Sequence, residues 1–125
     1  MRFDYEDSTP LYLQVANQIE ESILTEAFKE NEQIPSTTEI SKTFNMNPAT
    51  VLKGMNLLVD KQLIEKKRGR GMFVTAGARE KVQAERKINF FQEKIQPVIR
   101  EAQQLNVSKS ELLLLIERGY QRGEN

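Results

Sequence analysis

The stretch of sequence that decides the fold is residues 34–74, which read IPSTTEISKTFNMNPATVLKGMNLLVDKQLIEKKRGRGMFV. Two cap signals divide its first half. Ser36 stands three residues before Glu39, the spacing of a reciprocal capping box at a helix N-terminus. Asn47 precedes Pro48, which suits an N-cap followed by proline at the first helical position. Because only a few residues separate the two predicted helices, they must cross steeply, as in a helix-turn-helix.

The second predicted helix, residues 48–61, has one apolar face and one polar face. The side chains predicted to face the core recur at helical spacing and are Val51, Met55, Leu58 and Val59. Those on or beside the opposite face are Ala49, Thr50, Lys53 and Asn56. Such small, hydroxyl, amide and cationic groups near a helix N-terminus suit the DNA major groove, where they meet base edges or phosphates. An ordinary solvated face is the alternative interpretation of the pattern.

A short hairpin with a basic tip is predicted to follow this helix. Residues 63–66 and 72–75 have the composition of two strands. The tip between them consists of Lys67, Arg68, Gly69, Arg70 and Gly71. The glycines allow the positive φ of a tight turn, and cations with little bulk around them suit phosphates or a narrow minor groove. A basic turn alone is a common surface feature, but after a capped helix pair it predicts a winged helix that binds nucleic acid.

An amphipathic helix is predicted before the motif, over residues 10–25 with Thr9 as its N-cap. Its apolar stripe, which is predicted to cover the motif, consists of Leu11, Val15, Ile19 and Ile23. Tyr12 lies beside the stripe, where either packing or a phosphate contact would suit it. Residues 27–33 are predicted to be a connection, with a short strand at Phe28 that pairs with the wing.

From residue 78 onward the sequence is typical of long helices. Residues 78–105 carry apolar side chains at intervals of three or four. Pro97 interrupts this pattern, and because it removes a backbone hydrogen bond it is predicted to kink or break the helix near Glu93. A second, very apolar helix is predicted over residues 112–120.

This last helix carries more apolar surface than a helix pair can bury. Ser108 and Glu111 form a capping box that precedes it, and residues 112–116 read LLLLI. Since an amphipathic helix pair without a third layer is marginal, we expect a second copy of the chain to cover it. The alternative is that these helices fold back on the first domain. The predicted dimerisation residues are Phe91, Ile95, Val98, Leu105, Leu112, Leu113, Leu115 and Ile116.

Composition narrows the classes of function. The 125-residue chain has no cysteine and no histidine, so disulfides, thiolate metal sites and the commonest general base are excluded, and we expect no cofactor and no metal. No apolar run resembles a signal peptide or a membrane span, which favours the cytoplasm. The formal net charge is zero, but residues 1–35 carry −6 and residues 36–75 carry +4, and a polyanion meets the local charge.

Residues 10–74 resemble the DNA-binding domain of the GntR family of bacterial transcription regulators. The resemblance rests on PLYLQV near the start, IPS before the motif and RGRGMFV at its close. Asn47 and Pro48, followed by ATV, are similar to the YtrA-like subfamily, where Asn-Pro replaces the more common Ser-Arg. The sequence departs from the family at Thr38, where an Arg is usual, and it lacks the Gly that usually precedes this segment. The resemblance implies repression, often of a neighbouring transporter operon, and dimerisation through a short helical C-terminal segment.

The sequence therefore predicts a mainly α protein with a small β-hairpin wing, in which residues 1–76 are a winged helix-turn-helix DNA-binding domain and residues 77–125 a helical dimerisation segment. The expected function is a dimeric, sequence-specific regulator, most simply a repressor, that binds an inverted-repeat operator in double-stranded DNA. The residues predicted to contact DNA are Ser36, Thr37, Thr38, Asn47, Pro48, Ala49, Thr50, Lys53, Lys67, Arg68, Gly69 and Arg70.

Three other functions fit the sequence less well. A winged helix that binds protein would favour an apolar or acidic outer face on the second motif helix, unlike the face seen here. An enzyme would need a catalytic constellation, and no acidic pair is tied to a nucleophile or to phosphate-cradling glycines. RNA is a poor target because A-form helices have a narrow major groove. A small-molecule effector stays open, since no cluster of polar residues points to one.

Overall fold

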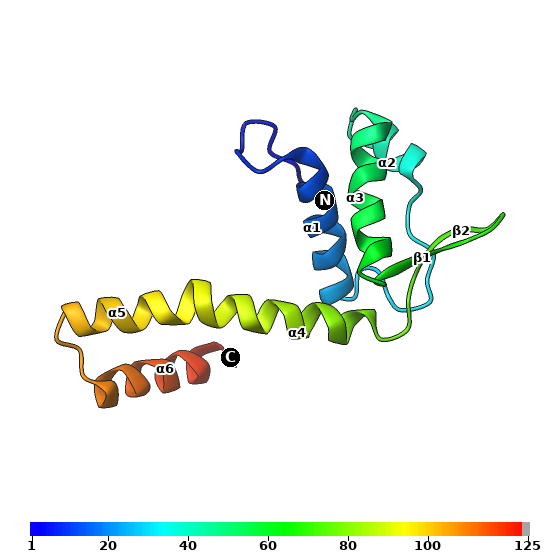
Figure 1. The fold of residues 1–125 in the computed structure, drawn as a ribbon. Helices are drawn as coiled ribbons and strands as arrows, with labels where there is room; N and C mark the ends of the chain where they lie inside the picture. The colour runs from blue at the N-terminus through cyan, green and yellow to red at the C-terminus, as the bar shows by residue number, and fades with distance from the viewer. Residues whose placement is uncertain (124–125) are drawn as a thin grey trace. The chain divides into compact units, whose positions relative to one another are not determined.

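The computed structural model describes residues 1–123 and is mainly helical with one antiparallel hairpin (Figure 1). The elements are α1 (Leu11–Leu24), α2 (Thr37–Thr43), α3 (Pro48–Asp60), β1 (Ile64–Lys67), β2 (Gly71–Val74), α4 (Ala78–Phe90), the π-helical turn η1 (Phe91–Ile95), α5 (Gln96–Gln104) and α6 (Lys109–Gly123). The predicted fold class is confirmed. The chain forms two compact units, Met1–Glu85 and the residues from Arg86 onward. The predicted boundary between a DNA-binding domain and a dimerisation segment, at residues 76/77, stays a proposal.

The core of the first unit lies between α1 and α3, with α2 and the hairpin closing it. Three residues of the predicted apolar stripe of α1, Val15, Ile19 and Ile23, are at most 1% exposed, and the fourth, Leu11, is half-buried against the core. On α3 the buried side chains are Val51, Met55 and Leu58. The prediction that Val59 faces the core is wrong, because its side chain is 36% exposed. Gly54, one turn before Leu58, occupies the contact with α1 instead, so the buried stripe is displaced toward that side of the helix.

Gly54 allows α1 and α3 to approach closely, and Figure 1 shows the two helices side by side. A Cβ atom at this position would lie 2.6 Å from the Tyr12 carbonyl oxygen and 3.0 Å from the Val15 Cβ. Since a carbonyl oxygen of a helix cannot swing aside as a flexible side chain can, a side chain here would push the two helices apart.

The motif helices begin as their cap signals predict. The Ser36 hydroxyl accepts a hydrogen bond from the Glu39 N–H at 3.1 Å, and the Glu39 carboxylate accepts one from the Ser36 N–H, which completes the capping box. The Asn47 side chain accepts from the Ala49 N–H at 2.9 Å, with Pro48 in the first turn. The prediction that Thr9 caps α1 is wrong. Pro10 holds that position without a side-chain cap bond.

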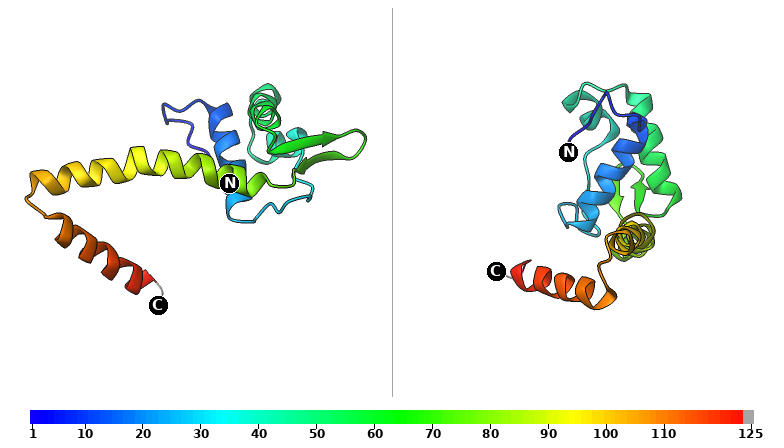
Figure 2. Two further views of the ribbon diagram at one scale, coloured as in Figure 1. Left: turned by 60° about the horizontal axis from the view of Figure 1, so that its bottom comes forward. Right: turned by 90° about the vertical axis from the view of Figure 1, so that its left-hand side faces the viewer.

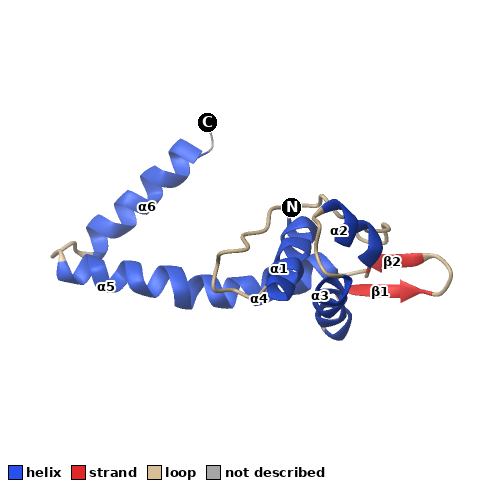
Figure 3. Ribbon diagram, turned by 90° about the horizontal axis from the view of Figure 1, so that it is seen from above, coloured by secondary structure: helices blue, strands red, loops and turns tan. Residues whose placement is uncertain are grey.

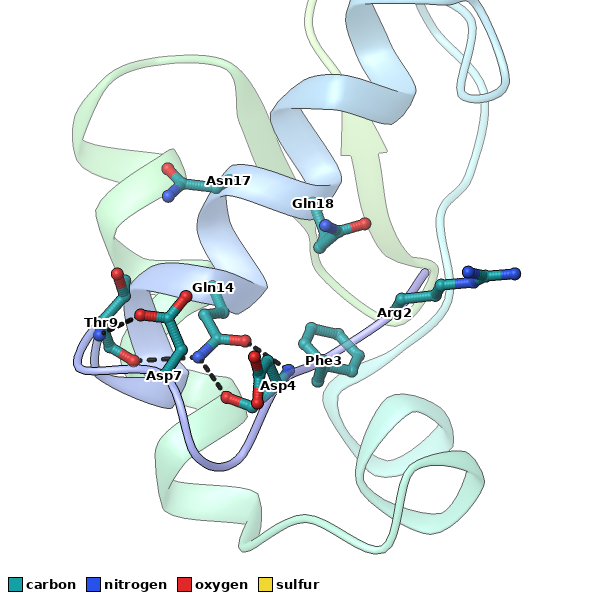
Figure 4. A pocket seen from close by; sticks show the side chains of 8 residues that line it. All are labelled: Arg2, Phe3, Asp4, Asp7, Thr9, Gln14, Asn17 and Gln18. Carbon is teal, nitrogen blue, oxygen red and sulfur yellow. Dashed lines mark hydrogen bonds between the residues drawn. The ribbon is translucent and has the colours of Figure 1, made fainter.

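The N-terminal arm, residues 1–8, is tied to the motif. The Phe3 and Phe44 rings meet edge to face at 4.8 Å between centroids, and the Tyr5 hydroxyl donates to the Phe44 carbonyl at 2.7 Å. The Gln14 amide anchors the base of the arm, because it accepts from the Asp4 N–H and donates to the Asp4 carbonyl, each at 2.8 Å (Figure 4). The arm therefore braces the turn between α2 and α3.

The wing is a short antiparallel hairpin (Figure 3). An isolated bridge from the connection before α2 pairs with its second strand. Its strands pair from Ile64 opposite Val74 to Lys67 opposite Gly71, close to the predicted boundaries. The predicted pairing of Phe28 with the wing is wrong. Gln33 makes this bridge, opposite Phe73, while Phe28 packs half-buried against the core.

The first turns of α4 belong to the first unit. Ala78 and Val82 are buried in its core, and the Lys61 ammonium lies 3.0 Å from the Glu20 carboxylate and 3.2 Å from that of Glu85. Burial alone would lower the pKa of Lys61, but its hydrogen bonds to Glu20 and Glu85 outweigh that effect and raise the pKa above its ordinary value. This ammonium joins α1, the end of α3 and α4.

Replacing Lys61 by methionine is expected to lower the free energy of unfolding by about 1–2 kcal/mol, because the carboxylate of Glu20, only 6% exposed, loses its hydrogen bond and ion pair with the Lys61 ammonium. The effect stays modest since 43% of the Lys61 side chain meets solvent. As the folded-state pKa is raised, this stabilisation is complete at neutral pH and is lost as the pH rises through that value. Urea titrations from neutral to strongly alkaline pH test this, with the exposed Lys66→Met as control; a difference that persists at high pH contradicts it.

In the second unit the helix continues through Pro97. The predicted alternative of a break is wrong, because the residues before the proline form the π-helical turn η1 and α5 follows directly (Figure 2). The irregularity lies where the sequence predicts it, since η1 contains Glu93. A wider turn separates the proline ring from the carbonyl that it would otherwise strike, which keeps the helix continuous. Ser108 accepts a hydrogen bond from the Glu111 N–H at 3.1 Å, as its cap signal predicts, and α6 is longer than expected at both ends. Among residues 1–123, no helix is long and apolar enough to cross a membrane.

Candidate nucleic-acid interface

The outer face of α3 presents the predicted reading residues to solvent. Ala49, Lys53 and Asn56 are exposed, and Thr50 is half-buried beside them. Because the capped first turn fixes the start of α3, these side chains project from a rigid helix rather than from a loop. The mixture of a methyl group, a hydroxyl, an amide and an ammonium group suits the edges of bases and the phosphates beside them.

The other predicted contacts in the motif lie at the two helix N-termini. Ser36 and Thr37 are half-buried, and Thr38 is exposed in the first turn of α2. The side-chain oxygens of Ser36 and Asn47 are already bonded to backbone N–H groups. These two residues therefore position their helices first, and any contact with DNA falls to the hydroxyl proton of Ser36 and the amide protons of Asn47.

Lys53 is held by an aromatic ring from another helix. Its ammonium nitrogen lies 4.0 Å from the centroid of the Tyr12 ring, a cation–π distance. The close approach of α1 and α3 at Gly54, the next residue along, brings the two side chains together. Tyr12 thus packs beside the reading face, and the ring restricts the Lys53 side chain.

Replacing Tyr12 by leucine is expected to weaken DNA binding about two- to fivefold, which corresponds to the roughly 0.5–1 kcal/mol of an exposed cation–π contact. Tyr12→Phe keeps the ring and is the matched control, with affinity close to that of the native chain. Fluorescence anisotropy with a labelled duplex measures both. Tighter binding by Tyr12→Leu would contradict the prediction and show that Lys53 leaves the ring when DNA arrives.

The wing tip carries its cations around one buried ring. The Lys67 ammonium lies 4.6 Å and the Arg70 guanidinium 5.2 Å from the centroid of Phe73, whose side chain is 7% exposed. Arg68 is exposed at the turn. The turn is closed by a bond from the Arg70 N–H to the Lys67 carbonyl at 2.8 Å, and the predicted positive φ is found at Gly69, at 75°. Sequence reasoning missed Phe73, because a strand residue that alternates inward gives no sign of holding cations.

The predicted dimerisation residues are mainly exposed apolar side chains of the second unit. Phe91, Val98, Leu105, Leu113, Leu115 and Ile116 are 44–67% exposed. Ile95 and Leu112 are half-buried. The structure gathers only some of them in one place. An apolar cleft of about 470 Å³ between α5 and α6 is lined by Ile95, Val98, Leu112, Leu113 and Ile116 among others, and its lining does not include Phe91, Leu105 or Leu115.

A capped helix pair whose second helix exposes a polar face, followed by a basic hairpin, defines a winged helix-turn-helix protein. Residues 11–74 match the family model described as bacterial regulatory proteins, gntR family. The chain belongs to this family.

Similarity to individual relatives extends beyond the matched domain. The chain is 30% identical over 112 residues to the HTH-type transcriptional repressor YtrA of Bacillus subtilis, covering 90% of this chain and 85% of that protein, which supports the YtrA-like assignment. It superposes with a TM-score of 0.75 at 31% identity on a putative GntR-family regulator from Bacteroides thetaiotaomicron, covering 90% of this chain and 98% of that one.

A third likeness concerns a structure that contains DNA. The DNA-binding domain of AraR in complex with operator ORR3 matches with a TM-score of 0.53 at 27% identity, covering 60% of this chain and 90% of that chain. The shared part is of the size of the winged helix-turn-helix unit alone.

Proposed function

We propose that this chain is a sequence-specific DNA-binding transcription regulator, and that it acts as a repressor. The observation that carries the proposal is the exposed face of α3, with Ala49, Lys53 and Asn56, in the same compact unit as a wing whose tip carries three cations. The α3 face enters the major groove and reads bases, and the wing contacts phosphates or the minor groove. The relationship to the repressor YtrA supports the sign of regulation.

The regulator binds as a homodimer. One winged helix makes too few contacts for high specificity, whereas two copies related by a two-fold axis read an inverted repeat. The exposed apolar side chains of α5, η1 and α6 supply the surface for the second copy, since a large exposed apolar surface typically marks a site of protein–protein contact. On this proposal the residues from 77 onward are the dimerisation segment. The protein binds the cell's own DNA in the cytoplasm.

On this proposal the protein has no enzymatic activity. Members of its family are regulatory proteins. The polar side chains that the motif exposes are suited to contacts with a duplex rather than to proton transfer or nucleophilic attack, because none of them is paired with a general base.

The test of the proposed function is fluorescence anisotropy with the duplex that lies upstream of the protein's own gene. A scrambled duplex of the same length and composition is the control, and both are titrated across a salt series. Tight binding to the native fragment alone, with two chains per duplex, supports a specific dimeric regulator. Equal and strongly salt-dependent binding to both would reduce the proposal to non-specific electrostatics. Absence of binding at low salt would overturn it.

Replacing Arg70 or Lys67 by alanine is expected to weaken binding to every duplex alike. Each loss of a phosphate contact should also reduce the slope of log affinity against log salt by about one. Lys87→Ala, which removes an exposed cation from α4, is the matched control and should leave the slope unchanged. An unchanged slope for both wing variants would remove the wing from the interface.

A further inference from the structure

We propose that Gln33 is a positioning residue for the wing: its side chain fixes the tip in the conformation that presents Lys67 and Arg70 to DNA. The inference rests on the proposed DNA binding and concerns how the wing is prepared for it. Gln33 lies in the connection between α1 and α2, far along the chain from the hairpin, and nothing in its local sequence marks it for this role.

The Gln33 side chain binds the tip directly. Its Nε2 donates to the Arg70 carbonyl at 2.8 Å, across 37 positions of sequence. The same carbonyl belongs to the residue whose N–H closes the turn onto Lys67, at 2.8 Å. One side-chain hydrogen bond from outside the hairpin therefore holds the peptide between Arg70 and Gly71, where the turn ends and β2 begins.

The backbone around Gln33 brings its side chain to this place. Gln33 forms a bridge with Phe73, the Ile34 N–H donates to the Met72 carbonyl at 2.9 Å, and the Val74 N–H donates to the Glu32 carbonyl at 3.0 Å. These bonds hold the connection in an extended conformation beside β2, although only Gln33 itself forms a bridge. Extended backbone that is bonded on both sides of Gln33 fixes the direction in which its side chain leaves the backbone.

The glycine at position 71 leaves room for the bond. Gly71 has φ of 114°, and a Cβ atom there would lie 2.6 Å from the Gln33 Nε2. Gly69, the other glycine of the tip, also has positive φ, but a Cβ on it would meet nothing within 4 Å. The amide of Gln33 thus occupies space that only a glycine at position 71 provides.

The cations of the tip benefit from this arrangement. Lys67 and Arg70 both lie over the Phe73 ring, and Phe73 is the residue that pairs with Gln33. A hairpin of two four-residue strands is marginal by itself. Without an external support its tip would lose conformational entropy on binding DNA, which weakens affinity without removing any contact.

The experiment is a double-mutant cycle on DNA affinity, measured by anisotropy with the upstream duplex. Gln33→Met keeps the length of the side chain and removes its donor. Alone, it is expected to weaken binding about three- to tenfold, the cost of ordering one to two side chains. In a background that carries both Lys67→Ala and Arg70→Ala, the same change should cost less than about twofold, because no cations remain to be positioned.

A second cycle with Lys53→Ala is the matched control and should be additive, since Lys53 lies on α3 and contacts Tyr12 rather than the wing. Amide hydrogen exchange of the full-length protein without DNA should show faster exchange at the wing tip in Gln33→Met, with an unchanged melting temperature.

Additive loss in the wing background would overturn the proposal and make Gln33 a direct DNA contact. Unchanged affinity and exchange would also overturn it. If the native protein binds no duplex, the proposed function has failed, and the exchange result still decides whether Gln33 holds the wing.

Discussion

Replacing Leu115 by glutamate is expected to dissociate the proposed homodimer and to lower affinity for the upstream duplex about 100-fold or more. Leu115 is 55% exposed on α6 and does not line the cleft between α5 and α6. A carboxylate there therefore leaves the helix pair itself intact but must be desolvated when a second copy covers the surface. The loss of affinity follows because a dimer holds its second winged helix at a high effective concentration near the second half-site.

Sedimentation velocity measures the assembly, and anisotropy with a full inverted repeat and with a single half-site measures the binding. Ser110→Glu places the same charge at an exposed polar position of α6 and should leave the dimer unchanged. Leu113→Glu should act like Leu115→Glu, although Leu113 also lines the cleft. A dimer that persists in both leucine variants would contradict the assignment of α6 to the interface. So would half-site affinity that falls as much as affinity for the full repeat.

Replacing Gly54 by alanine is expected to lower the free energy of unfolding by about 1–3 kcal/mol, even though alanine favours a helix over glycine by roughly 1 kcal/mol. The new Cβ would lie 2.6 Å from the Tyr12 carbonyl oxygen, so α1 and α3 must separate and their buried side chains lose contact. Gly54→Val should cost more, since its γ-methyl groups add bulk at a position where the Cβ atom alone would already lie 3.0 Å from Val15. Urea denaturation followed by circular dichroism gives the values.

Gly119, in the interior of α6, is the matched control. A Cβ at this position would meet nothing within 4 Å, so Gly119→Ala should be neutral or stabilising by up to about 1 kcal/mol. The contrast between the two glycines separates steric cost from helix propensity. Equal stabilisation by both substitutions would contradict the close helix contact at Gly54. Because α3 carries the reading face, Gly54→Ala should also weaken DNA binding.

The order and limits of the elements follow from signals that act over a few residues. The pairs Ser36 with Glu39 and Asn47 with Pro48 place the starts of α2 and α3, because each cap bond joins groups within one turn of helix. Apolar spacing identified the buried sides of α1 and α3, since the period of the helix alone decides which side chains share a face. The resemblance to GntR regulators rested on the same local motifs, and the family match confirms it.

Only the tertiary structure determined the contacts between residues that lie far apart in sequence. The pairing of Gln33 with the wing, the ring of Phe73 under two cations and the ammonium of Lys61 between two acidic side chains depend on how helices and strands cross. Val59 is exposed because α3 contacts α1 on the side of its apolar stripe that carries Gly54, away from Val59. The helical period of the apolar residues does not show which side of the stripe makes this contact. A local sequence pattern determines the hydrogen bonds within one helix or turn. The distance between two helices or strands instead depends on the volumes of all the side chains packed between them, and these side chains come together only in the folded chain.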